Sequence, residues 1–177
     1  EKIRHSYQVL GAGNYILRHE PCFQNCSKEK ISYYQGIVLL HDVCRFIEIL
    51  EKEGYHPVIK AFCWMQGEGD ACSKEGAEQY IKLYDAMLKD FREAFADDLE
   101  RCTFFDAGVS DVWPFYYIVN AEKKAYAERN ADCRYFDTLA AGLTTANEPF
   151  EQPDIAHYDT DSVIKLGKMF ADEILLD

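Results

Sequence analysis

Short apolar runs alternate with long helical patterns through most of this chain. The helical stretches repeat apolar residues every three or four positions, whereas the short runs end in polar, glycine-containing segments. We therefore predict helices at 34–53, 73–95, 116–130 and 161–175, and strands at 58–64, 102–109 and 133–139. Because strands that alternate with helices pair in parallel, the pattern predicts an α/β protein whose sheet is covered on both faces.

The stretch 73–95 shows the helical pattern most clearly. Its apolar face is predicted to comprise Ala77, Tyr80, Ile81, Tyr84, Met87, Leu88, Phe91 and Phe95. Ser73 stands where an N-cap is expected, and Gly54 stands where a helix ending near Glu53 would place its C-cap glycine. In the last helix Val163, Leu166, Phe170 and Ile174 are predicted to share one side.

Composition excludes several classes of partner. The 177 residues fit one domain, and the formal net charge of -12 disfavours binding to nucleic acid or to an anionic membrane surface. No apolar run approaches the ~20 residues that span a bilayer.

The cysteines bear on the compartment. There are seven, an odd number without regular spacing, which favours reduced thiols and a cytoplasmic over a secreted protein. Cys44 and Cys63 lie in apolar segments, where a thiol behaves as a small hydrophobe. The chain begins with Glu1 and shows no signal peptide, and a removed signal peptide would reverse the compartment.

One segment contains residues that could bind zinc. His19, Cys22 and Cys26 could supply three ligands, but their spacing matches no standard zinc knuckle and no fourth ligand is evident. We therefore favour an irregular loop and expect no metal or cofactor. A Cys22–Cys26 disulfide remains an alternative in an oxidising compartment.

Polar loops follow three of the predicted strands. They are Gln66–Asp70, Gly108–Asp111 and the long segment 140–160. In parallel sheets ligands bind beyond the carboxyl ends of the strands, where these loops would meet. The loops are therefore the candidate site.

The loop after the first of these strands combines flexible backbone with polar groups. Gly67 and Gly69 allow close approach of a ligand, and Gln66 offers an amide N–H to developing negative charge. Glu68 and Asp70 could orient neighbouring groups or bind sugar hydroxyls. The alternative is an ordinary turn that ends in a helix cap at Asp70 or Ser73.

Asp154 and His157 are three residues apart, so their side chains can meet in a tight turn. A carboxylate bonded to one imidazole nitrogen fixes the tautomer and leaves the other nitrogen to act as a general base on a hydroxyl. The alternative is a surface pair without a role.

Together these segments resemble a known family. Residues 64–71 (WMQGEGDA) resemble the Trp-x-Gln-Gly-Glu-x-Asp-Ala block of sialate O-acetylesterase-like proteins and of carbohydrate esterase family 6, the acetyl xylan esterases, which are SGNH hydrolases. Residues 154–159 (DIAHYD), followed by Leu166-Gly167, resemble the terminal Asp-x-x-His block and the helix after it. The resemblance is strongest over 34–175. It identifies the chain as the C-terminal portion of a single SGNH-type esterase domain.

The resemblance implies a flavodoxin-like three-layer fold and a metal-independent removal of acetyl groups from sugars. It implies that His157 is the general base, that Asp154 orients it, and that Gln66 lies in the oxyanion region, which Gly67 and Glu68 shape. Gly69 departs from the small polar residue that the family often has at its position.

The family's Gly-x-Ser block, which carries the nucleophile after the first strand, is absent. We expect residues before Glu1, in the same or a separate chain, to supply that strand and serine, leaving an exposed sheet edge here. Residues 5–10 are predicted to form a short strand, and Gly11 or Gly13 in the following turn is the candidate for the family's second oxyanion glycine. Ser110 follows a strand, but Trp113-Pro114 interrupts the helix that a nucleophile elbow needs, so a loop or N-cap role is expected.

Two functions remain open. The first is an esterase that deacetylates xylan, sialic acid or related sugars. The second is a catalytically inactive relative that binds glycans or a protein partner. Aromatic residues near the predicted site edge fit sugar stacking or ordinary packing equally well: Trp113, Phe115, Tyr116, Tyr117 and Tyr158.

Overall fold

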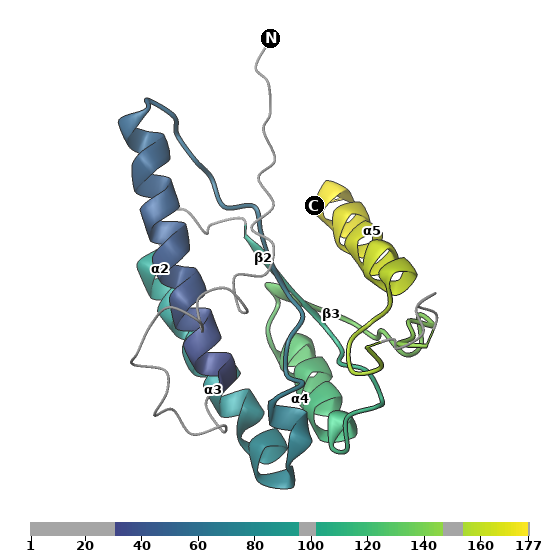
Figure 1. Ribbon diagram of the computed structural model, residues 1–177. Coiled ribbons are helices and arrows are strands. Elements are labelled where there is room, and N and C mark those ends of the chain that lie inside the picture. Colours follow the sequence, from purple (N-terminus) through teal and green to yellow (C-terminus); the bar gives the residue numbers. More distant parts are fainter. Residues whose placement is uncertain (1–30, 96–101, 147–153, 177) are drawn as a thin grey trace.

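The computed structural model describes residues 31–95, 102–146 and 154–176, and side chains from residue 39 onward (Figure 1). The elements are α2 Ile31–Lys52, β1 Ala61–Trp64, the 3-10 helix η3 Asp70–Cys72, α3 Lys74–Ala94, β2 Thr103–Ala107, α4 Tyr116–Arg129, β3 Cys133–Phe136 and α5 Thr160–Leu176. Every predicted helix and strand within these ranges is present. The predicted strand at 5–10 lies outside them, as do Gly11 and Gly13.

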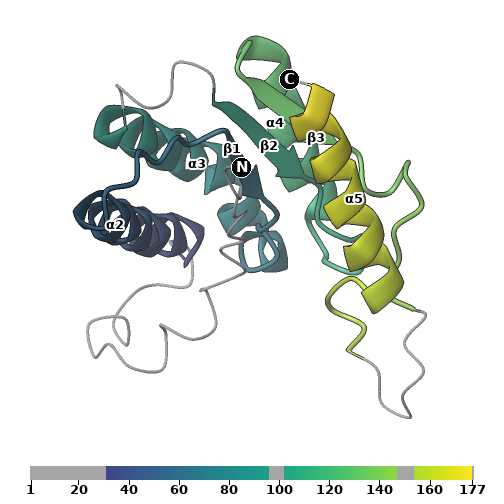
Figure 2. The same cartoon turned by 90° about the horizontal axis from the view of Figure 1, so that it is seen from above.

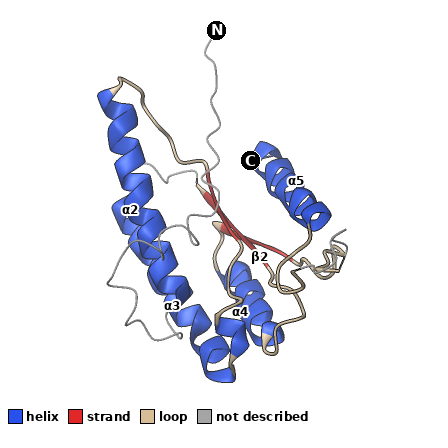
Figure 3. Ribbon diagram, viewed as in Figure 1, coloured by secondary structure: helices blue, strands red, loops and turns tan. Residues whose placement is uncertain are grey.

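The three strands form one parallel sheet in the order β1-β2-β3. Ala61 pairs with Thr103 in the first ladder, and Phe104 pairs with Cys133 in the second. The helices α3 and α4 are the crossovers that parallel pairing requires, and Figure 3 shows the strands (red) lying between helices (blue).

One face of the sheet carries the larger apolar core. Phe62 and Trp64 of β1 point to this face, where Phe62 contacts the ring of Phe91 on α3 at 4.6 Å between centroids. The predicted apolar face of α3 is buried here, with Ile81 half-buried, and α2 and α4 pack beside it. Ser73 caps α3 as predicted, since its hydroxyl accepts the N–H of Gly76 at 3.1 Å.

Helix α5 covers the opposite face, which completes three layers (Figure 2). Phe105 and Phe136 stack across the strands, and Phe170 of α5 packs edge-on against both rings. The residues of α5 that were predicted to share one side do not all face the sheet, because Val163 is exposed. Its neighbour Ser162 is buried instead, and its hydroxyl accepts the N–H of Thr144.

The sheet is open on one side. Within the described ranges β1 has a strand neighbour only in β2, so its other edge is unpaired. Cys63, on the β1 face opposite α3, is exposed although it lies in an apolar segment. In the described part of the chain the architecture is α/β with a three-stranded parallel sheet flanked by helices, consistent with a flavodoxin-like SGNH fold of which one strand is not among these residues.

The strands end earlier than predicted. Residues 108 and 109 leave β2 to join a loop, and residues 137–139 leave β3 in the same way. None of the described helices is long and apolar enough to cross a membrane. The five cysteines of the described ranges are free thiols.

Candidate functional site

Three loops meet at the carboxyl ends of the strands. The loop after β1 is tied to the loop after β2 by a hydrogen bond from Phe115 N to Ala71 O at 3.0 Å. The loop after β2 is tied to the segment before α5 by the indole of Trp113, which donates to Ala156 O at 3.0 Å. The structure therefore brings all three predicted loop segments to one edge of the sheet.

Gly67 gives the first loop its sharp turn. Its φ of 135° lies in the region that favours glycine. A Cβ at this position would come within 3.0 Å of Val119 Cγ1 and 3.2 Å of Tyr80 Cε2. The buried glycine thus permits both the conformation and the close packing of this loop on α3 and α4.

The backbone of Gln66 is hydrogen-bonded to a side chain of α3. The hydroxyl of Tyr80 donates to the Gln66 carbonyl oxygen at 3.3 Å, and burial raises the pKa of Tyr80 well above its ordinary value, so the donor stays protonated. The side-chain oxygen of Gln66 is buried and has no hydrogen-bond partner within the described ranges. A buried acceptor oxygen without a partner is unusual, and this oxygen is available to a donor on a ligand.

The two acidic residues of this loop differ. Glu68 is half-buried, whereas Asp70 is only 1 % exposed and begins η3. Of the two roles considered for Asp70, its burial favours the orientation of neighbouring groups over contact with a sugar.

Asp154 and His157 form the predicted pair. The Nδ1 of His157 lies 2.6 Å from Asp154 Oδ2, and Asp154 Oδ1 accepts the N–H of Ala156 at 2.9 Å. The hydrogen bond to His157 is the main cause that lowers the pKa of Asp154. With the proton on Nδ1, the Nε2 atom can accept one from a hydroxyl. The imidazole is 61 % exposed, so that nitrogen is accessible.

The segment that carries His157 is anchored to the loops that follow β2 and β3. The hydroxyls of Tyr158 and Thr138 lie 2.7 Å apart, and each is 3.1 Å from the carbonyl oxygen of Gly108. Burial raises the pKa of Tyr158 to about 12, so the phenol remains a donor. This network fixes the chain one residue beyond His157.

Two side chains of α4 fix the end of β2. The amide of Asn120 accepts from Val109 N at 2.8 Å and donates to Val109 O at 2.9 Å, as a neighbouring strand would. The buried ammonium of Lys123 lies 2.7 Å from Asp106 Oδ1 and 2.8 Å from Ala107 O. The sequence analysis did not predict a role at the site for Asn120 or Lys123. It also did not predict that Tyr80 and Thr138 anchor the site loops. The sequence did contain one indication of the role of Lys123. It is spaced from Val119 and Tyr126 as residues on the same side of a helix are, and all three are buried.

Other predicted groups are not brought to the imidazole. Ser110 is 3 % exposed, and within the described ranges its hydroxyl has no hydrogen-bond partner. In the same ranges the His157 ring is hydrogen-bonded to Asp154 alone. The zinc alternative at His19, Cys22 and Cys26 lies outside the described residues, as do Gly11 and Gly13.

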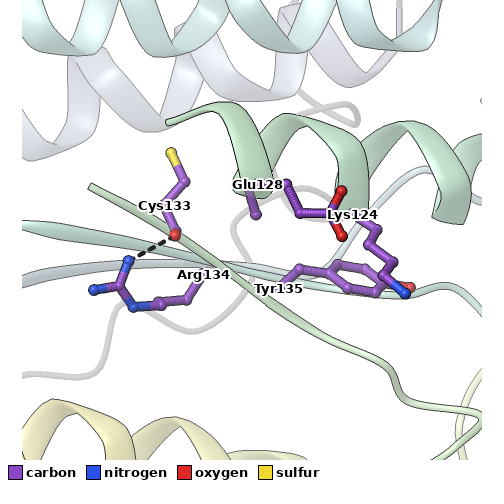
Figure 4. A pocket seen from close by; sticks show the side chains of 6 residues that line it. Lys124, Glu128, Cys133, Arg134 and Tyr135 are labelled. Atoms are coloured by element: carbon purple, nitrogen blue, oxygen red, sulfur yellow. Dashed lines mark hydrogen bonds between the residues drawn. The ribbon is translucent and has the colours of Figure 1, made fainter. Parts of the chain in front are cut away.

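Two hollows on the described surface differ in character. One, of about 210 Å³, is lined by Val112, Trp113, Ile155 and Ala156 beside the His157 segment. The other, of about 320 Å³, lies between α4 and the start of β3. Figure 4 shows its lining, where Arg134 donates to the carbonyl oxygen of Cys133. Cys133 opens β3, so this second hollow lies toward the amino ends of the strands.

Comparison with known proteins agrees with these features. Residues 27–176 match the model of a family described as carbohydrate esterase, sialic acid-specific acetylesterase. No curated protein and no solved structure matches the chain. The match spans most of the sequence and includes both predicted blocks, so the chain belongs to the sialic acid-specific acetylesterase family of carbohydrate esterases.

Proposed function

We propose that this chain forms most of the catalytic domain of a serine-dependent carbohydrate O-acetylesterase, which removes acetyl groups from xylan, sialic acid or related sugars. The observation that carries the proposal is the Asp154–His157 pair, with a 2.6 Å contact and an accessible ring nitrogen, on the same edge of the sheet as Gln66, whose side-chain oxygen is buried. Membership of the esterase family supports the reaction class.

The reaction proceeds through an acetyl-enzyme. A serine oxygen attacks the acetyl carbonyl carbon while His157 Nε2 takes the hydroxyl proton, and Asp154 stabilises the imidazolium. Gln66 and its loop stabilise the negative charge on the carbonyl oxygen. The proton then passes to the sugar oxygen, which leaves. Water, deprotonated by His157, hydrolyses the acetyl-serine to acetate and restores the serine.

The serine is proposed to come from sequence preceding Glu1, on a strand that pairs with the free edge of β1. Two features support this arrangement: among the described residues no strand pairs with the outer edge of β1, and Cys63 on that strand is exposed. Gly11 or Gly13 would supply a second oxyanion N–H.

The test uses the complete protein encoded by the source reading frame, with acetate release from O-acetylated sugars as the readout. His157→Ala is expected to lower turnover by about 10²–10⁴-fold, the usual contribution of a general base. His56→Ala is the matched control, since His56 is exposed near the opposite ends of the strands. A folded wild-type protein that releases no acetate would favour the inactive glycan-binding or partner-binding alternative, whereas turnover unaffected by His157→Ala would remove His157 as the general base.

A further inference from the structure

The turn that presents His157 is hydrogen-bonded to a tryptophan of another segment. The indole N–H of Trp113 donates to Ala156 O at 3.0 Å, and Ala156 N donates to Asp154 Oδ1 at 2.9 Å. Both backbone polar groups of the residue before His157 are therefore occupied. In the part of the chain that the structure describes, the bond from Trp113 is the one hydrogen bond that joins residues 154–157 to another segment.

The indole also lies against the imidazole. The ring centroids of Trp113 and His157 are 6.4 Å apart and the ring planes make an angle of 65°, which is an edge-to-face arrangement. The hydrogen bond to Asp154 holds one ring atom and leaves rotation about that contact open, and the indole limits this rotation from a second direction. The side chains of Asp154 and His157 are 63 % and 61 % exposed, so solvent surrounds most of the pair.

Trp113 is itself held in place on both sides. Its half-buried side chain packs against the larger apolar core between the sheet and α3. Two residues further on, Phe115 N donates to Ala71 O at 3.0 Å, directly beyond the loop that carries Gln66. Residues 113–115 therefore join the Gln66 loop to the turn that carries the imidazole.

This connection matters for a reaction that uses both segments. A general base and an oxyanion donor must act on the same acyl group, so the distance between them has to stay fixed during turnover. A misplacement of about 1 Å can cost about 10²-fold in rate. An exposed imidazole on a short turn meets this requirement only if another part of the fold holds the turn.

We propose that Trp113 is a positioning residue of the esterase site, whose indole fixes the His157 imidazole relative to the Gln66 loop. The proposal rests on the esterase function proposed above, because it takes His157 as the general base. Trp113 acts through His157 and takes no part in bond making or proton transfer. It lies outside both sequence blocks, 64–71 and 154–159.

The first experiment measures kcat and KM of the complete protein with 4-nitrophenyl acetate. Trp113→Phe keeps an aromatic ring and removes the N–H donor, so kcat should fall about 10-fold while KM changes less than about twofold. In a His157→Ala background the same substitution should leave the residual kcat unchanged, because residues that act as one unit are not additive. An equal fall in both backgrounds, or an unchanged kcat in Trp113→Phe alone, would overturn the proposal.

Asn130→Ala is the matched control for lost stability. The Asn130 amide also donates to a backbone carbonyl, Tyr126 O at 2.8 Å, but at the end of α4 that leads into β3, away from the site loops. Both variants should show a small drop in Tm, and only Trp113→Phe should lower kcat. An equal loss of kcat in both variants would show that kcat follows stability, and Trp113 would lose its positioning role.

Carbon-13 NMR relaxation of the His157 Cε1–H group tests the positioning without turnover. The order parameter of this group reports the mobility of the ring on the picosecond to nanosecond scale. It should fall in Trp113→Phe and stay at the wild-type value in Asn130→Ala. An unchanged order parameter in Trp113→Phe would overturn the proposal.

The two readouts separate this inference from the proposed function. A ring that becomes mobile in Trp113→Phe, in a protein that hydrolyses no ester, would sink the esterase function and leave the hold of Trp113 on the imidazole standing. Ester hydrolysis that depends on His157, with kcat and ring mobility unaffected by Trp113→Phe, would do the reverse.

Discussion

Asp154 uses both carboxylate oxygens inside one turn: Oδ2 lies 2.6 Å from His157 Nδ1, and Oδ1 accepts the N–H of Ala156 at 2.9 Å. The carboxylate therefore shapes the turn and orients the ring that the turn presents. Hydrogen bonding to His157 lowers the pKa of Asp154, so the group is ionised at neutral pH.

Asp154→Asn should separate these two tasks in the complete protein. The amide oxygen can still accept from Ala156, but an amide no longer stabilises the imidazolium and can favour the wrong tautomer. We expect kcat to fall by about 10²–10⁴-fold with little change in thermal stability. Asp42→Asn is the control, since Asp42 also faces a histidine, His41, at 3.7 Å on the surface of α2. Equal kcat in both variants would show that Asp154 has no part in catalysis.

Gln66→Ala should lower turnover without lowering stability. The Gln66 side-chain oxygen is buried without a partner within the described ranges, so its removal relieves an unpaired polar group. Loss of an oxyanion donor typically lowers kcat by about 10²–10³-fold. The expected result is therefore a large drop in kcat with an unchanged or raised Tm. A lowered Tm with unchanged kcat would assign Gln66 a structural role instead.

Gly67→Ala should disturb the same loop through its backbone. The substitution forces a side chain into a φ of 135° and sets its Cβ 3.0 Å from Val119 Cγ1. Strained backbone of this kind costs about 1–3 kcal/mol, and the contact adds to it. Urea unfolding should show this loss, together with reduced kcat.

Gly54→Ala is the control for that prediction. Gly54 also has a positive φ, of 83°, but a Cβ added there would meet nothing within 4 Å, and the residue lies in the connection between α2 and β1, outside the site loops. The substitution should cost about 1 kcal/mol and leave kcat unchanged. A Gly67 variant no worse than the Gly54 variant would mean that the loop adjusts freely.

The order of the elements was predictable because periodicity reports burial. Ser73 and Gly54 occupy the predicted cap positions, and the predicted residues of α3 face the core. Periodicity does not report which face of a sheet is covered. For that reason the exposure of Cys63 was not foreseen, nor was that of Val163 on α5.

The site was predictable only where its contacts are local. The pairing of Asp154 with His157 spans three residues and could be inferred from their spacing. The anchors are contacts between distant positions: Tyr80 with Gln66, and Thr138 with Gly108. No local pattern specifies such pairs, and the roles of the site residues stay predictions.

The buried ion pair at the end of β2 gives a prediction that depends on pH. Burial raises the pKa of Asp106 to about 6, although Lys123 lowers it. Lys123→Met removes that lowering influence and leaves a buried carboxylate without its partner. At pH 7.5 we expect a loss of about 3–5 kcal/mol in the free energy of unfolding.

The sign of the pH dependence follows from the proton that Asp106 binds. The pKa of Asp106 is higher in the folded than in the unfolded chain, so folding takes up a proton between about pH 4 and 6. This group's contribution to stability therefore falls as pH rises through that window. Without Lys123 the window extends upward, so the difference between variant and wild type should be large at pH 7.5 and small at pH 5. Urea unfolding at both pH values measures it, and Lys124→Met, on the exposed side of α4, should show no difference at either. A loss independent of pH would mean that the packing of the lysine stem, and not its charge, stabilises this end of β2.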